Sequence, residues 1–141
     1  MGNTNGIIKI NYEDIQYAIN NKIIIINTLN TNQQNCLIKN TICIEEETEL
    51  INSLLQNYKM SEKIIIYGKN SNDHKIFDKY EQLIKLGFRN VYLYTGGLFE
   101  WLCLQDIYGS DNFPTTTDEL DLLKYKAPSL FNDHFLLQNI D

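Results

Sequence analysis

The sequence predicts an α/β fold in which one five-stranded, mainly parallel sheet lies between two layers of helices. Apolar runs without polar alternation occur at residues 23–26 and 64–67, and such runs are typical of parallel strands covered on both faces. Predicted strands alternate along the chain with segments of helical apolar spacing, which implies crossover connections within one sheet. At 141 residues the chain is long enough for one such domain and too short for two.

The first half of the chain is predicted to contain three strands and two helices. A short strand spans residues 7–10, and Asn11 follows it as the N-cap of a helix. The second strand spans residues 23–26, and a short third strand spans residues 41–44. Residues 45–58 form the second helix, because acidic residues in the first turn suit the helix dipole and leucine and isoleucine recur on one face.

The second half begins with the apolar strand at residues 64–67 and ends in a short helix. A polar loop follows the strand, and a helix starts near Asp73 and stops at Gly87, because glycine adopts the left-handed conformation that ends many helices. The last strand spans residues 91–94, a glycine turn follows, and residues 98–104 form the short helix.

The chain is predicted to divide into a tail, a domain and an extension. Residues 1–6 are expected to be a flexible tail, and residues 7–113 are expected to form the α/β domain. Residues 114–141 are expected to be a C-terminal extension that packs on the domain or trails from it. Pro114 breaks the chain at its start, and residues 118–124 are predicted to form one more helix.

Charge and hydropathy exclude two classes of partner. The net charge is −6 and the lysines are scattered singly, so the sequence lacks the positive surface that binds a phosphate backbone. No apolar run approaches the roughly eighteen residues of a membrane span. We therefore expect neither nucleic acid nor a membrane as a partner.

The cysteines and histidines show no disulfide or metal pattern. Cys36, Cys43 and Cys103 are odd in number and unclustered, and only two histidines accompany them. This usage predicts a reducing compartment, the cytoplasm, and no metal or cofactor.

A series of glycine and aromatic residues marks the ends of the predicted elements in the second half of the chain: Gly68, Gly87, Phe88, Gly96, Gly97 and Trp101. This order resembles the second half of a rhodanese domain, where a strand ends in the catalytic cysteine and is followed by a loop, a helix, a Gly-Phe pair, a strand, a Gly-Gly pair and a tryptophan. By the order of its elements, the resemblance extends over residues 7–113. It implies a rhodanese-like, three-layer fold.

The same resemblance places Gly68 where the family has its catalytic cysteine. Residues 27–29 read Asn-Thr-Leu where the family usually has Asp-x-Arg, and residues 36–41 lack the family's glycines and histidine. Without a side chain, Gly68 can neither attack a sulfur donor nor carry a persulfide. The related phosphatase pattern, a cysteine followed six positions later by arginine, has His74 at its second position. We therefore predict a domain without catalysis that acts as a binding or regulatory module.

The predicted binding residues lie in the loop after the second apolar strand and in the glycine turn after the last strand: Gly68, Lys69, Asn70, Ser71, Asn72, Asp73, Gly96 and Gly97. Backbone N–H groups of such a loop can hold a small anion or the carboxylate of a protein partner, and Lys69 adds charge. The alternative is that Asp73 caps the same N–H groups in an ordinary exposed turn. An aromatic surface of Phe99, Tyr108 and Phe113 is a second partner site, whereas Trp101 is predicted to be core.

The rival prediction is an enzyme. A displaced cysteine, Cys103, could support sulfur transfer or phosphate handling, although free cysteines are more often small core residues. An acid–base reaction by Asp73 and His74 is the other form of this prediction.

Overall fold

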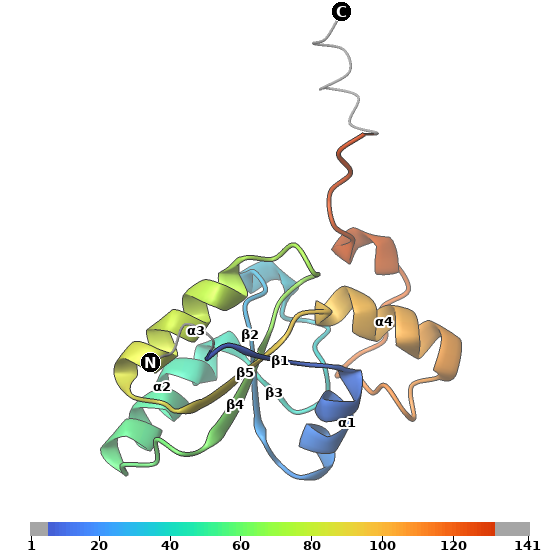
Figure 1. Cartoon of the computed structure of the whole chain (residues 1–141). Helices are drawn as coiled ribbons and strands as arrows, with labels where there is room; N and C mark the ends of the chain where they lie inside the picture. The colour runs from blue at the N-terminus through green and yellow to red at the C-terminus, as the bar shows by residue number, and fades with distance from the viewer. Residues whose placement is uncertain (1–5, 132–141) are drawn as a thin grey trace, which may run out of the picture.

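The protein, analysed as a computed structural model, is described over residues 6–131; residues 1–5 and 132–141, including most of the predicted tail and the end of the extension, lie outside that range. One all-parallel sheet has the strand order β1-β5-β4-β2-β3 (Figure 1). The strands are β1 (Ile8–Ile10), β2 (Ile24–Asn27), β3 (Thr41–Ile42), β4 (Lys63–Tyr67) and β5 (Asn90–Tyr94). The α/β prediction is confirmed, and the sheet is parallel throughout.

Within the described part of the chain, four α-helices cover the sheet, two on each face (Figure 1). They are α1 (Tyr12–Asn20), α2 (Ile44–Gln56), α3 (Lys75–Leu86) and α4 (Gly97–Tyr108). Alternate residues of β4 enter opposite cores: Ile65 and Tyr67 face α1 and α4, whereas Ile64 and Ile66 pack with α2 and α3. Both faces of the central strand are therefore buried, which explains its uninterrupted apolar sequence.

The predicted N-terminal cap of α1 and the predicted C-terminal stop of α3 are present. Asn11 accepts the backbone N–H groups of Glu13 and Asp14, and Asp14 accepts the N–H of Asn11, which completes a capping box. Gly87 ends α3 in the left-handed conformation, at φ +109°. These signals are local, so the sequence shows them directly.

Two helix predictions differ from the structure. The helix after β5 continues beyond residue 104 to Tyr108, because the next helix-ending residue is Gly109, whose N–H donates to the Gln105 carbonyl at 2.8 Å. The helix predicted at 118–124 is only a 3₁₀ turn, η2 (Leu122–Tyr125). There the Glu119 carboxylate accepts the N–H of Asp121 at 3.1 Å, a side-chain bond that competes with helix formation.

The described part of the extension packs on the domain. Pro114 accepts hydrogen bonds from the Lys39 N–H and the Trp101 indole, both at 3.1 Å. Tyr125 is 2% exposed and lies in the core between the sheet, α1 and α4. The chain thus returns across the α1 and α4 side after α4 ends. No helix within residues 6–131 is both long and apolar enough to cross a membrane.

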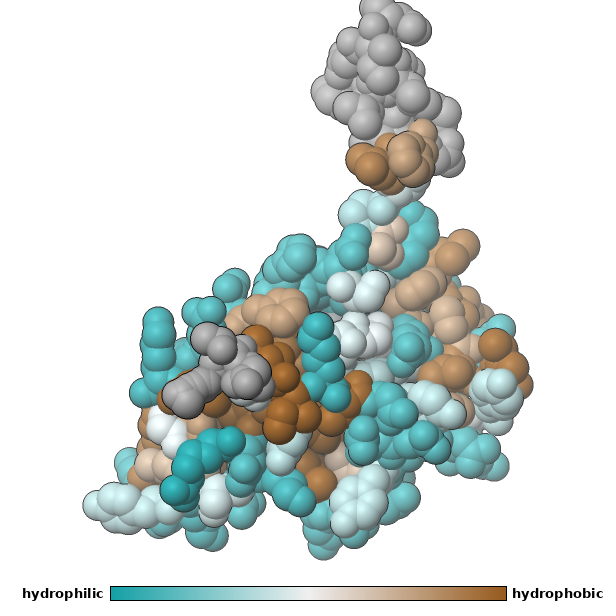
Figure 2. All heavy atoms as spheres, in the orientation of Figure 1, coloured by the Kyte–Doolittle hydropathy of each residue, from teal (hydrophilic) through white to brown (hydrophobic). Residues whose placement is uncertain are grey.

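The predicted aromatic surface does not exist as a unit. Phe113 is 4% exposed and its ring lies 5.0 Å from the Trp101 ring, centroid to centroid; the prediction that it is a surface residue is wrong, because the returning chain inserts it into the core. Trp101 is fully buried, as predicted, and Phe99 is partly buried. Tyr108 remains exposed at the outer end of α4, where Figure 2 shows apolar side chains at the surface.

Candidate functional site at the carboxyl ends of β4 and β5

The structure brings together the two segments that sequence analysis selected. Because β4 and β5 are parallel neighbours, with Tyr67 beside Tyr94, the loop after β4 and the turn after β5 emerge at the same edge of the sheet. The N–H of Leu98 donates to the Gly68 carbonyl, and the N–H of Phe99 donates to the Lys69 carbonyl, both at 2.9 Å. The start of α4 therefore holds the loop in place.

Gly97 makes this contact sterically feasible. It adopts φ +72°, and a Cβ atom there would lie 2.8 Å from the Gly68 carbonyl oxygen and 2.9 Å from the Asn70 nitrogen. Both neighbours are backbone atoms that cannot swing aside. Only glycine satisfies the conformation and the close approach together.

The Asp73 carboxylate lies inside the loop. One of its oxygens accepts hydrogen bonds from the Lys69 N–H and the Thr28 hydroxyl, and the other accepts from the Lys75 N–H, all at 3.0 Å. Two of these donors are backbone N–H groups, one of them in the first turn of α3. An internal anion thus occupies the position that an anionic ligand of this loop would take.

The same carboxylate fills the space beside Gly68. A Cβ atom on residue 68 would overlap the nearer carboxylate oxygen of Asp73 and lie 2.7 Å from its Cγ and 2.9 Å from the Thr28 hydroxyl oxygen. These separations are below normal van der Waals contact. A side chain at residue 68 and the observed position of Asp73 are mutually exclusive.

Asn70 attaches the loop to the C-terminal segment. Its side chain is 7% exposed; the amide donates to the Tyr125 carbonyl at 2.9 Å, and the amide oxygen accepts the Asn72 N–H at 2.8 Å. Asn70 is therefore committed to internal bonds. Ser71 and Asn72 are exposed at the tip of the loop.

A polar cavity of about 460 Å³ opens over the loop. Its lining includes three lysines, Lys69, Lys75 and Lys126, together with His74 and Asp73. Lys75 donates to the Asn30 side chain at 2.8 Å, and no carboxylate in the described range forms a salt bridge with any of the three lysines. In a chain of net charge −6, this cavity is a local concentration of positive charge.

Sequence analysis missed three residues of this site, Thr28, Lys75 and Lys126. Lys75 begins α3, directly beyond the predicted loop, so extending the loop by one helical turn would have included it. Thr28 follows β2, whose carboxyl end meets that of β4, so the parallel strand arrangement could have identified it. Lys126 reaches the cavity only because the extension returns across the domain and Asn70 binds it at Tyr125. No local pattern signals that return.

The cysteines lie elsewhere. Cys36 is 2% exposed and donates to the Thr117 carbonyl at 3.5 Å, and burial raises the pKa of its thiol. Burial, with the charges of Asp106 and Glu100, also raises the pKa of Cys103, which lies within α4. Cys43 directly precedes α2. A raised pKa reduces the thiolate fraction, the reactive form of cysteine.

Between residues 6 and 131, no three or more His, Cys, Asp or Glu side chains are grouped so that they could hold a metal ion.

Comparison with known proteins identifies the fold. The Alr3790 protein of Anabaena sp. has a TM-score of 0.54 at 19% identity, with 82% of this chain and 86% of that chain covered. The BH2092 protein of Bacillus halodurans has a TM-score of 0.53 at 20% identity, with 72% of this chain and 74% of that chain covered. Ygr203w, a yeast protein tyrosine phosphatase of the rhodanese family, has a TM-score of 0.50 at 14% identity, with 82% of this chain and 96% of that chain covered.

The family itself is identified from the sequence. No curated protein matches this chain. The sequence model of the rhodanese-like domain family matches residues 13–103. Among the described elements, this range includes α1 to α4, in part or in full, and the strands β2 to β5. The chain therefore belongs to the rhodanese-like domain family.

Proposed function

We propose that this protein is a rhodanese-like domain without catalytic activity that acts as a binding or regulatory module. The observation that supports this proposal is the place of the Asp73 carboxylate beside Gly68. The resemblance to the family assigns the residue after β4 to the nucleophilic cysteine, and in this chain that residue is Gly68.

Sulfur transfer of the family type needs a thiolate and room for an anionic sulfur donor. Gly68 supplies no thiolate. The N–H groups of Lys69 and Lys75 are already bound to Asp73, and the negative charge of that carboxylate repels a second anion at the same place. Both requirements for the covalent step are therefore unmet at this loop.

The cavity outside the loop is suited to binding. Lys69, Lys75 and Lys126 present ammonium groups around it, and they attract carboxylates or other anions without needing the donors that Asp73 occupies. We infer that an acidic segment of a partner protein, or a small anion, binds against these lysines. The exposed loop tip at Ser71 and Asn72 adds polar contacts.

The enzymatic alternative has less support. Its displaced nucleophile, Cys103, has a raised pKa and lies within α4. In the proposed acid–base pair, both carboxylate oxygens of Asp73 already accept hydrogen bonds, from the Lys69 N–H, the Thr28 hydroxyl and the Lys75 N–H, so the carboxylate is turned toward the protein's own donors.

One experiment tests the absence of catalysis. Thiosulfate:cyanide sulfurtransferase activity and intact mass after thiosulfate treatment are measured for the natural protein, Gly68→Cys, and Gly68→Cys combined with Asp73→Ala. Ser71→Cys places a thiol on the exposed loop tip as the matched control. We expect no turnover and no persulfide in the natural protein and the control, and the greatest persulfide formation in the double variant. Turnover by the natural protein would overturn the proposal.

A second experiment tests binding. A hexaglutamate peptide is titrated into the labelled protein while backbone amide resonances are recorded. We expect saturable shifts at Lys69, Lys75 and Lys126 that Lys126→Glu weakens. Lys85→Glu, at an exposed position in the last turn of α3, should leave binding unchanged apart from the common effect of net charge. An equal loss of peptide affinity in Lys126→Glu and Lys85→Glu would argue against a local binding site at the cavity.

A further inference from the structure

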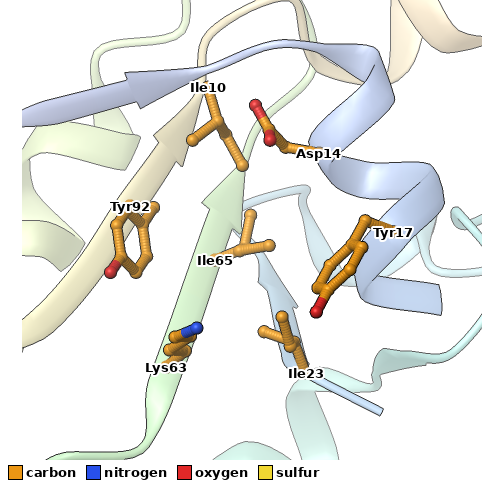
Figure 3. Close-up of a pocket in the computed structure, with 7 residues that line it drawn as sticks. All are labelled: Ile10, Asp14, Tyr17, Ile23, Lys63, Ile65 and Tyr92. Atoms are coloured by element: carbon orange, nitrogen blue, oxygen red, sulfur yellow. The ribbon is translucent and has the colours of Figure 1, made fainter. Parts of the chain in front are cut away.

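A second hollow lies on the face of the sheet that α1 and α4 cover, away from the loop (Figure 3). Its floor is Ile65, in the middle of β4, and Lys63 at the first position of that strand lies at its lower end in this view. The loop with Gly68 begins beyond the opposite, carboxyl end of β4. The two sites therefore use different parts of the same strand.

The hollow has an apolar floor between two aromatic side chains. Tyr17 from α1 and Tyr92 from β5 lie on either side of Ile65, and Ile10 and Ile23 complete the apolar surface (Figure 3). Tyr17 is 59% exposed, so its ring borders an open space instead of filling it. The volume is about 210 Å³, which compares with roughly 150 Å³ for an apolar cavity that accepts benzene.

Opposite charges mark the two ends of the hollow. The Lys63 ammonium group lies at one end, and within residues 6–131 no carboxylate forms a salt bridge with it. Asp14 lies at the other end beside Ile10 (Figure 3) and is held there by the N–H of Asn11 at 3.1 Å. A ligand with one negative group therefore has a single favourable orientation, with its charge toward Lys63 and away from Asp14.

We propose that this hollow binds a small aromatic monocarboxylate, with its ring over Ile65 between Tyr17 and Tyr92 and its acid group beside Lys63. The ring replaces water on an isoleucine surface and contacts two aromatic side chains, which favour edge or offset stacking. The ammonium group supplies the charge partner for the acid. A second acid group at the far end of the ring would meet Asp14, so dicarboxylates are disfavoured. This inference does not depend on the function proposed for the loop.

The test is a titration of the full chain with sodium benzoate, monitored through the backbone amide resonances. We expect saturable shifts at Tyr17, Lys63, Ile65 and Tyr92. Lys63→Gln should weaken binding about fivefold, the effect of losing a partly exposed ion pair of about 1 kcal/mol. Lys9→Gln removes an exposed lysine from β1, next to Leu93 of the opposite core, and should leave the affinity unchanged.

Two further ligands and one variant complete the test. Benzamide, which has the same ring without the charge, should bind more weakly than benzoate, and terephthalate should also bind more weakly. Tyr17→Ala, at an exposed helix position, should weaken benzoate binding about threefold or more. Absence of saturable shifts in the natural protein would overturn the proposal, as would benzoate shifts confined to the residues around Lys69 and Lys75. Equal affinity for benzamide and benzoate would also overturn it, because the assignment to a carboxylate depends on Lys63.

Discussion

The Asp73 carboxylate occupies the space that a side chain on residue 68 would need. A Cβ atom at Gly68 would lie 2.7 Å from the Asp73 Cγ. Five residues apart in the chain, the two positions are thus coupled: glycine at 68 permits the observed position of Asp73, and that position closes the loop through the N–H groups of Lys69 and Lys75. The chemistry of the loop therefore depends on both residues together.

The first prediction concerns the coupling of these two positions. Gly68→Ala should lower the free energy of unfolding by about 1–3 kcal/mol, because the new methyl group displaces the carboxylate from its hydrogen bonds. When Asp73 is already replaced by alanine, Gly68→Ala should lower the free energy of unfolding by at least about 0.5 kcal/mol less than it does in the natural protein. Urea unfolding of the four proteins in this double-mutant cycle measures the coupling. Additive effects would show that Asp73 moves away freely and that the two positions are independent.

The second prediction concerns the two glycines at the ends of α4. Gly97 and Gly109 both have positive φ angles, +72° and +98°, but only Gly97 has backbone atoms within 4 Å of the place of a Cβ atom. Gly109→Ala should therefore destabilise the fold by about 1 kcal/mol through backbone strain alone. Gly97→Ala should cost about 2 kcal/mol more, since it also separates the loop from α4. Thermal unfolding of both variants compares them directly, and equal costs would contradict the steric argument.

The third prediction concerns stability at alkaline pH. Burial raises the pKa of Tyr67 above its usual value, and its phenol oxygen lies 2.9 Å from the Thr41 hydroxyl and accepts the Ile38 N–H at 3.1 Å. Below pH about 10 this tyrosine is protonated in both the folded and the unfolded chain. Above that pH the unfolded chain loses its proton first, so the free energy of unfolding falls by up to about 1.4 kcal/mol per pH unit for this residue.

Urea unfolding at pH values spaced about 1 unit apart from about 8 to about 11 measures how steeply the free energy of unfolding falls with pH. Tyr67→Phe should be less stable at neutral pH by about 1–2 kcal/mol, because the Ile38 N–H loses its acceptor. Its stability should nevertheless decrease less steeply above pH about 10. Tyr17→Phe, at an exposed position, should leave the slope unchanged. A slope in Tyr67→Phe as steep as that of the natural protein would refute the assignment.

The sequence by itself determined the strands and helices that carry local signals. The apolar runs of β2 and β4 identified strands buried on both faces, since an alternating pattern would have indicated one solvated face. Asn11 and Gly87 fixed helix ends because capping involves only residues within one turn. The order of these elements, with Gly96 and Gly97 after the last strand, was enough to indicate the fold and the edge of the sheet where the loop lies.

The tertiary structure alone decided what fills and surrounds that loop. Whether Asp73 caps a helix in solvent or occupies the loop depends on the conformation that α4 imposes through Leu98 and Phe99. Phe113 became core and Lys126 joined the cavity because the extension returns across the domain. Contacts between residues far apart in the chain depend on the packing of whole elements, and hydrophobic spacing within one segment carries no information about them.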